Sequence, residues 1–225
     1  MGPHPARAKE PNMRSVTGVA VLVCTLAAGR AVAEDWEQVS TGDIAIKARP
    51  YTAVTGGREV WAEGVLPVTL QDVQTALTEH DNFRLFMPYV TESRLLARGA
   101  DGARVTYTRL DFPLISDRDY VLRVLDLPVL DAEGKQVAFH QKWTPDNSTL
   151  PERAGVVRLR HNQGSWYFTP RAEGGVHFVY RFIVEPGGSI PGFLAGVGQK
   201  DAVEATVRGV EKRALKLAAD RAQAK

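Results

Sequence analysis

Four of the five histidines are the side chains in this sequence best suited to proton transfer or metal binding near neutral pH. His80, His140, His161 and His177 are scattered, with no paired spacing for a metal ion and no neighbouring cysteine. His140 alternates with the apolar Phe139, so we expect its ring to face solvent. The sequence also has no G-x-S-x-G elbow and no glycine-rich loop with phosphate-binding spacing. These patterns predict no catalytic residue, no metal site and no cofactor, and favour a protein that is not an enzyme.

The first 33 residues are typical of a secretory signal peptide. Met13 and Arg14 precede an apolar run over residues 16–28, and Ala31-Val32-Ala33 follows as a small-residue cleavage site. Cleavage there makes Glu34 the first mature residue and predicts a periplasmic or secreted protein. We interpret the residues before Met13 as a misassigned start or a dispensable extension.

Two other interpretations of this segment are weaker. A permanent membrane anchor requires a longer run than this one, which Thr17, Gly18 and Thr25 interrupt. A lipoprotein attachment at Cys24 is disfavoured because Val23 is larger than the small residue such sites usually carry. Cys24 is the only cysteine, so the mature protein has no disulfide or thiol chemistry.

Residues 34–225 have the length and composition of one globular domain. All aromatic residues follow position 33, and the sequence contains no repeat, low-complexity block or linker. Loss of four basic residues and one acidic residue with the first 33 changes the formal net charge from +2 to −1. A nearly neutral domain argues against a nucleic-acid partner, which is usually bound through many basic side chains.

Strands and two short helical segments are expected first. Residues 44–48 and 59–65 alternate around a glycine-containing loop and predict a hairpin. Apolar residues at spacings of three and four predict a helix over 70–77, with Thr69 as its N-cap, and a helical turn is expected over 83–86. The segments that follow are short and joined by glycine-rich turns, which favours an antiparallel meander. The strands expected there are 90–97, 103–110, 119–129, 136–143, 155–161, 165–169 and 176–185.

The chain is expected to end in a long amphipathic helix. Its apolar residues recur at spacings of four, three, four and three, with charged residues at other positions, so this stripe must face an apolar surface. Together these elements predict an α+β helix-grip fold, in which a curved antiparallel sheet wraps around the C-terminal helix, with two short helices after the first hairpin. The stripe consists of Val203, Val207, Val210, Ala214 and Leu217.

Several motifs resemble the START (steroidogenic acute regulatory protein-related lipid-transfer) family. The most specific are D-F-P-L-I-S-D-R-D-Y over residues 111–120 and E-P-G-G-S-I-P over 185–191. Trp36 followed by Glu37 is similar to the opening of the family, and residues 151–158 resemble its segment of proline, charged residues, glycine and valines. The resemblance spans nearly the whole mature chain and implies a START-like domain over 34–225 that encloses one lipid.

The sequence departs from the family at two positions that contact polar groups of ligands. Arg84 matches the arginine that meets the headgroup in members that hold phosphatidylcholine, but Pro88 replaces its acidic partner. Sterol-carrying members place an arginine six residues after that of the R-D-Y turn, where this chain has Val124. Arg123 lies one position away, and a shift of one residue in a strand reverses the face.

Strand alternation and the resemblance together give the candidate ligand-binding residues. Tyr120, Leu122 and Val124 are expected to point inward from one strand, and the apolar stripe of the last helix is expected to close the interior. Each aromatic residue in this set also fits an ordinary core position. The full set is Arg84, Tyr107, Tyr120, Leu122, Val124, Phe139, Trp143, Tyr180, Phe193, Val203 and Val207.

We therefore expect non-catalytic binding, and transfer, of one hydrophobic lipid, such as an acyl lipid, a hopanoid or a sterol-like compound. The ligand is the expected partner, with transient membrane contact and no nucleic acid. An alternative follows from the wider superfamily, which includes polyketide cyclases and aromatases; Tyr107, Arg109 and Arg84 are the candidates for such chemistry. A binding module that reports its ligand to a partner protein is a third interpretation.

Overall fold

The computed structural model describes residues 1–2, 36–188 and 192–224, with side chains described up to residue 188 and again from residue 200. Residues 35–225 form one compact folded unit. The expected signal peptide falls outside the described residues. No helix in the described part has the length and apolar character needed to span a bilayer.

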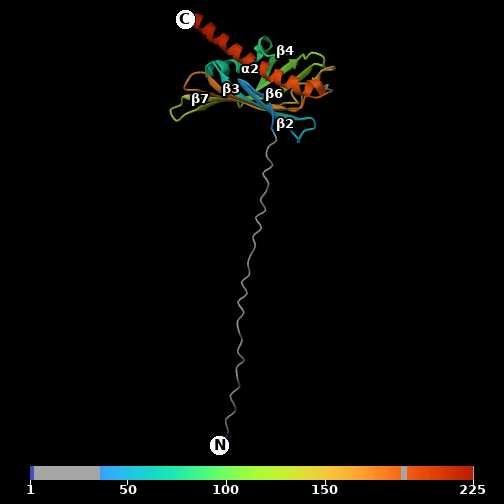
Figure 1. Ribbon diagram of the computed structural model, residues 1–225, viewed down its shortest axis with the longest axis vertical. Helices are drawn as coiled ribbons and strands as arrows, with labels where there is room; N and C mark the ends of the chain where they lie inside the picture. The colour runs from blue at the N-terminus through green and yellow to red at the C-terminus, as the bar shows by residue number, and fades with distance from the viewer. Residues whose placement is uncertain (3–35, 189–191, 225) are drawn as a thin grey trace. The chain divides into compact units, whose positions relative to one another are not determined.

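In the described residues, ten strands form one strongly curved sheet (Figure 1). Its order is β1-β2-β3-β10-β9-β7-β6-β5-β4, and every pair along this path is antiparallel. β10 therefore joins the first hairpin to the later meander. The strands are β1 (Glu37–Thr41), β2 (Ile44–Pro50), β3 (Arg58–Leu66), β4 (Val90–Arg98), β5 (Arg104–Leu110), β6 (Arg118–Leu130), β7 (Gln136–Pro145), β8 (Val157–Arg158), β9 (Asn162–Pro170) and β10 (Val176–Val184).

Two strands differ from the sequence-based expectation. β1 was not predicted, because its sequence E-Q-V-S-T has little hydrophobic alternation and the strand lies mostly exposed at the edge of the sheet. The strand expected over 155–161 is only the two-residue β8, which pairs with β6 in parallel. A short parallel segment cannot be part of a meander. From this segment the side chain of Arg158 reaches Asp119 on the outer face, whereas Leu159 lines the concave side.

The first short helix lies where the sequence predicted it, and the second begins three residues before the turn expected over 83–86. Helix α1 (Leu70–Thr78) begins at Thr69, whose Oγ1 accepts a hydrogen bond from the amide of Asp72 at 3.2 Å. The 3₁₀ helix η1 (His80–Leu85) follows directly. Together they cover one end of the concave face of the sheet.

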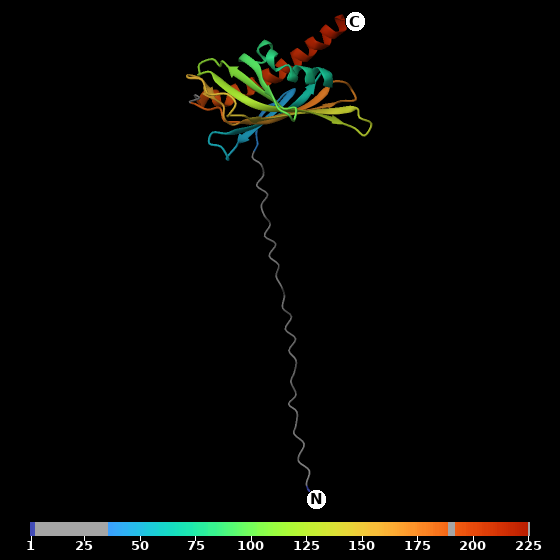
Figure 2. The same ribbon diagram turned by 180° about the vertical axis from the view of Figure 1, so that it is seen from behind.

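Helix α2 (Gly192–Gln223) runs diagonally across the concave face (Figures 1 and 2). At about 1.5 Å per residue its 32 residues span about 48 Å, long enough to cross the whole sheet. The predicted stripe faces inward: Val203, Val207, Val210 and Ala214 are all at least 97% buried. The curved sheet that grips this helix confirms the expected helix-grip fold.

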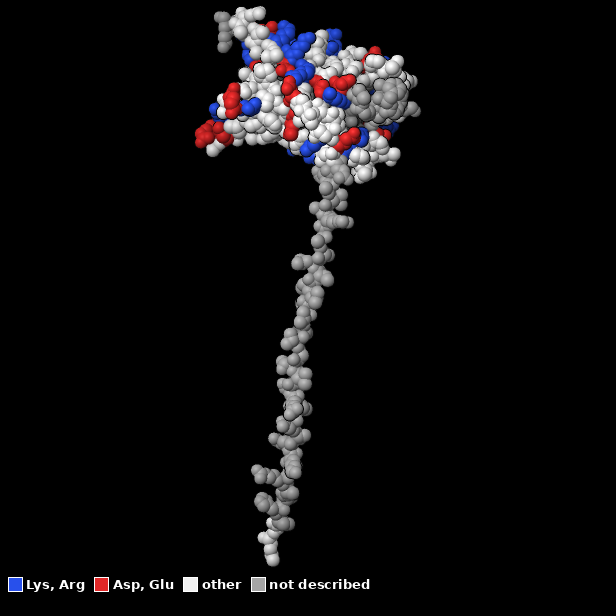
Figure 3. Space-filling model, in the orientation of Figure 1, with Lys and Arg blue, Asp and Glu red and all other residues white. Residues whose placement is uncertain are grey.

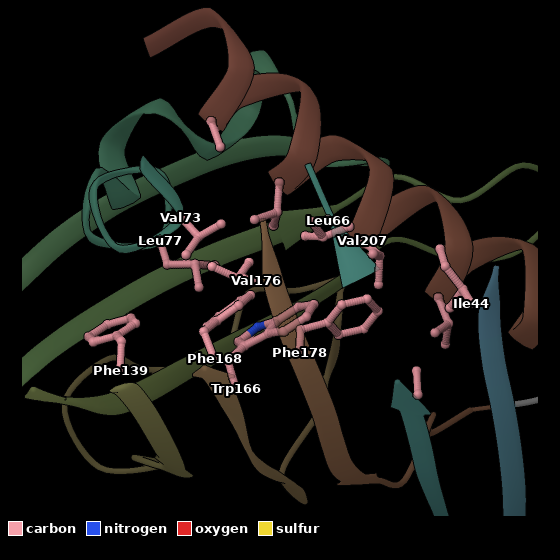
Figure 4. Close-up of a cluster of buried hydrophobic side chains, with 14 of the residues drawn as sticks. Ile44, Leu66, Val73, Leu77, Phe139, Trp166, Phe168, Val176, Phe178 and Val207 are labelled. Carbon is pink, nitrogen blue, oxygen red and sulfur yellow. The ribbon is translucent and has the colours of Figure 1, made fainter. Parts of the chain in front are cut away.

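The main core lies between α2, α1 and the central strands (Figure 4). Val207 projects from the helix toward Phe178 and Leu66, while Val73 and Leu77 reach the same cluster from α1. Trp166 and Phe168 stack almost in parallel, with ring centroids 5.6 Å apart. Burial of these large apolar side chains is the main force that fixes the helix on the sheet.

The C-terminal half of α2 is fixed by a close backbone contact and two ion pairs. A Cβ on Gly209 would lie 2.5 Å from the carbonyl oxygen of Phe86, so only glycine permits this approach. Beyond this contact, Arg213 pairs with Glu79 and Arg221 pairs with Asp72. This half of the helix is therefore anchored to α1 and η1.

The surface of the folded unit carries both signs of charge. On the face shown in Figure 3, basic and acidic side chains lie interspersed beside stretches that have neither. The distribution agrees with the nearly neutral net charge of residues 34–225.

Candidate ligand-binding cavity

A cavity of about 1010 Å³ lies between the concave face of the sheet and the N-terminal half of α2. Its volume is at the upper end of the range of about 300–1,000 Å³ that is usual for small-molecule sites. Most of its wall consists of aliphatic and aromatic side chains. These side chains include Leu122, Val124, Trp143, Trp166, Tyr180 and Phe182.

Stacked aromatic rings form one wall of this cavity. The rings of Trp166 and Tyr180 are nearly parallel, with centroids 3.8 Å apart, and Phe182 continues the row at 4.8 Å from Tyr180. Trp143 meets Tyr180 at 6.0 Å and donates from its indole nitrogen to Asn162 at 3.0 Å. Burial raises the pKa of the Tyr180 hydroxyl, so this wall is uncharged at physiological pH.

The inner end of the cavity is polar but electrically balanced. Arg104 is 4% exposed and binds the carboxylate of Asp126 through two nitrogens, at 2.9 and 3.0 Å. Gln141 donates to the same carboxylate at 2.7 Å and to the carbonyl oxygen of Leu77 at 3.2 Å. A paired cation and a satisfied amide add polarity without net charge.

His80 also lines this inner end. Its Nε2 lies 3.1 Å from the carbonyl oxygen of Tyr107 and 3.1 Å from the hydroxyl of Thr108. A carbonyl only accepts, so Nε2 carries the proton and donates. Burial lowers the pKa of His80 to about 4, which keeps the ring neutral at physiological pH.

The other end of the cavity is its mouth, where lining residues are exposed. Leu114, 85% exposed, and the exposed Gly188 and Asp201 mark this end. Arg118 lies just inside and is only 2% exposed. Its guanidinium donates to the carbonyl oxygens of Pro186 and Gly187, both at 3.3 Å, and to that of Ser116. The D-F-P-L-I-S-D-R-D-Y and E-P-G-G-S-I-P segments thus meet at the mouth.

Six of the predicted ligand-binding residues line the cavity. Strand alternation correctly places Tyr120, Leu122 and Val124 on the concave face of β6, while Val121 packs on the outer face. The other three come from β7, β10 and α2, and are Trp143, Tyr180 and Val203. Their contact with a ligand stays a prediction.

Four predicted residues lie elsewhere, and the expectation that they line the interior is corrected. Phe139 and Val207 are fully buried in the core. Phe139 lies beyond the inner end of the cavity, and Val207 lies one helical turn after Val203. Tyr107 points to the outer face of β5, because the inward side chains of that strand are Arg104 and Thr106. Arg84 is exposed on η1.

The side chain of Phe193 lies outside the described residues. Arg109, considered as a catalytic candidate, pairs with Asp117 at 2.5 Å and does not line the cavity. Among described residues, the sequence did not predict His80, Arg104, Trp166 or Phe182 as lining residues, nor Arg58, Asn162 and Arg118 near the mouth. Glycine-rich and turn sequences surround the three near the mouth, and periodicity assigns no face to such residues.

Comparisons with known proteins agree with this architecture. A family model described as polyketide cyclase / dehydrase and lipid transport matches residues 66–211. An uncharacterized protein of Pseudomonas aeruginosa, PA1579, is 29% identical over 215 residues, which cover 91% of this chain and all of that protein. Bovine phosphatidylcholine transfer protein is 28% identical over 142 residues, 63% of this chain and 64% of the relative.

Solved structures show the same fold. The STAR-related lipid transfer protein from Xanthomonas axonopodis has a TM-score of 0.67 and 26% identity, covering 80% of this chain and 98% of that one. Human StAR-related lipid transfer protein 5 has the same TM-score at 19% identity, covering 84% and 89%, respectively. A curved sheet that grips a C-terminal helix around an apolar cavity, together with a family match over residues 66–211, shows that this chain is a START-like member of the polyketide cyclase / dehydrase and lipid transport family.

Proposed function

We propose that the mature protein is a non-catalytic carrier, which holds one hydrophobic lipid in its cavity and transfers it between membranes across an aqueous compartment. The observation that carries this proposal is the cavity itself, with about 1010 Å³ of space inside a wall that is mostly aliphatic and aromatic. Transfer of apolar ligand surface from water into such a space gains about 25 cal/mol per Å². Acyl lipids, hopanoids and sterol-like compounds are the ligand classes that suit this wall.

A carrier is favoured over a cyclase or aromatase by the chemistry of the cavity wall. Tyr107, Arg109 and Arg84, the residues first considered for catalysis, all lie outside the cavity. At the inner end of the cavity, His80 donates to a backbone carbonyl and Arg104 is paired with Asp126. Neither is placed to exchange a proton with a substrate at neutral pH.

The proposed location is the periplasm or the extracellular space, on the evidence of the signal-peptide pattern in residues 1–33. The mouth offers a route for membrane contact. Leu114, with a left-handed φ of 68°, holds its side chain 85% exposed, and the rings of Tyr89 and Phe112 contact each other in a tilted arrangement, with centroids 4.7 Å apart. Exposed apolar side chains around a cavity mouth are suited to the apolar surface of a bilayer.

Native mass spectrometry of the protein, extracted gently from its host, tests the proposal. A co-purified lipid in a one-to-one complex, together with movement of labelled lipid between vesicles, is the expected result. A protein that is empty on extraction, and that moves no labelled lipid, contradicts it. Turnover of a polyketide-like substrate promotes the enzyme alternative.

A further inference from the structure

We infer that the mouth of the cavity contains an anion-binding site, formed by Arg58, Arg118 and Asn162, that selects lipids with one carboxylate or phosphate group. This inference rests on the proposed carrier function and names the ligand class more narrowly. The hydrocarbon part of such a lipid lies along the aromatic wall. Its anionic group stays at the mouth.

Arg118 is the main evidence, because its buried charge has no acidic partner. The side chain is 2% exposed and lines the cavity, and no carboxylate among the described residues pairs with it. Its hydrogen bonds go to three backbone carbonyl oxygens, of Ser116, Pro186 and Gly187. A guanidinium has five N–H donors and keeps its charge in proteins, so the site retains a positive charge that is not neutralised.

Neighbouring buried arginines show the contrast. Arg158, on the outer face, binds the buried carboxylate of Asp119 at 2.7 Å. Arg104, at the inner end of the cavity, binds Asp126. Buried cations are normally paired in this way because desolvation of an unpaired charge is costly. Arg118 therefore lacks the carboxylate partner that Arg158 and Arg104 have, and the anionic group of a ligand supplies one.

Arg58 and Asn162 add donors at the same end of the sheet. Both pair with Val184 of β10, from its two sides, and both line the cavity. The Nε of Arg58 is buried and has no hydrogen-bond partner among the described groups. The Oδ1 of Asn162 accepts from Trp143 at 3.0 Å, which leaves its amide N–H groups as donors without a described partner.

The positions of these groups set the orientation of the ligand. Arg118 pairs with Leu110, and Arg104 pairs with Val124, in the same β5–β6 ladder. These two pairs are six residues apart along β6, about 20 Å at 3.3 Å per residue. The neutralised inner end thus lies far from the unpaired charge at the mouth, so the anionic group stays near Arg118.

Two carboxylates also line the mouth. Arg58 Nη2 donates to the carboxylate of Glu37, which is 71% exposed, at 3.3 Å, and Asp201 is exposed on α2. Neither pairs with Arg118. Their exposure places them in water, where their repulsion of a ligand anion is strongly screened.

The test compares matched ligands that differ only in charge. Fluorescence titration of the mature protein with a pyrene-labelled hexadecanoic acid and the corresponding alcohol gives the preference for a carboxylate. A pyrene-labelled alkyl phosphate of the same length shows whether the site favours carboxylate or phosphate. Because charge-assisted hydrogen bonds are the strong ones, the native protein should prefer an anion over the alcohol by about 10-fold to 100-fold.

Arg118→Gln and Arg58→Gln are expected to lower this preference about tenfold or more while leaving affinity for the alcohol nearly unchanged. If Arg118→Gln unfolds the mouth because its hydrogen bonds to the backbone are lost, Arg58→Gln still tests the preference for an anion. Lys142→Gln removes one exposed charge from the outer face and should keep the preference. Equal affinity of the native protein for acid, phosphate and alcohol overturns the anion site and leaves the carrier proposal intact. If none of the three binds, and the protein also moves no labelled lipid between vesicles, the carrier proposal itself fails.

Discussion

Arg118 Nε donates to the carbonyl oxygen of Pro186 at 3.3 Å, joining two segments that are 68 residues apart in the sequence. The same guanidinium reaches the carbonyl oxygen of Gly187, which with Gly188 adopts a left-handed φ of 60°. The beginning of β6 therefore holds the loop that leads into α2. One side chain thus links β6, in the wall of the cavity, to the backbone of residues 186–187.

The buried ion pair between Arg158 and Asp119 should dominate the stability of the contact between β8 and β6. Arg158→Met leaves a carboxylate that is 1% exposed without its partner, and we expect a loss of about 3–5 kcal/mol in urea unfolding. The control is Arg160→Met, which breaks the exposed pair with Glu152 and should cost less than about 1 kcal/mol. Equal losses in the two variants would show that the Arg158–Asp119 pair is not buried.

His80 predicts a specific pH dependence of stability. Its pKa falls from 6.5 in the unfolded chain to about 4 in the folded protein, so the unfolded state binds more protons between these values. Stability should therefore decrease as pH falls from about 6.5 to about 4, by about 3 kcal/mol from this group. The free energy of unfolding, measured with urea at each pH in this range, should change less steeply with pH in His80→Gln than in the native protein. An unchanged slope would contradict the buried, neutral imidazole.

Val203 and Val207 lie one helical turn apart and should respond differently to enlargement. Val203 faces the cavity, so Val203→Phe should reduce the amount of bound lipid with little loss of stability. Val207 lies in closely packed core, so Val207→Phe should destabilise the fold by about 1–3 kcal/mol. Thermal unfolding and native mass spectrometry measure the two effects. The reverse pattern would show that Val207, and not Val203, faces the cavity.

Leu114 predicts how the carrier meets a membrane. Leu114→Asp should slow lipid transfer between vesicles, because a charge at this position opposes insertion of the mouth into a bilayer. Its affinity for a dispersed lipid analogue in solution should stay the same. Leu130→Asp, at an exposed position at the end of β6, is the control and should transfer lipid at the native rate. Equal rates for all three proteins would exclude Leu114 from the membrane contact.

The parts of the fold that follow from periodicity were predictable from the sequence. The stripe through Val203 and Val207 fixed the buried face of α2, and alternation along β6 gave the inward residues. Periodicity failed where long-range contacts decide the structure. β8 exists because the chain returns beside Arg118, and Tyr107 faces outward because β5 pairs with β6 in one particular register.

The candidate site was predicted in its apolar part and missed in its charged part. Tyr120, Trp143 and Tyr180 could be assigned because aromatic residues in inward strand positions face the interior. Arg118 lies beside Asp119 in the sequence, but its hydrogen bonds go to the Pro186 loop. The sequence could not show that Asp119 pairs with Arg158 instead, which leaves the neighbouring Arg118 without a counter-ion.

The contact between Gly209 and Phe86 divides α2 into two mechanically different parts. The helix residues that line the cavity, positions 201–203 and 206, all precede it, whereas Arg213 and Arg221 hold the helix after it. We expect an opening of the cavity on this side to move the turns ahead of Gly209, while the trailing turns stay clamped. That movement breaks the core contacts of Val207, which also precedes Gly209, so a guest enters only at a cost in core packing.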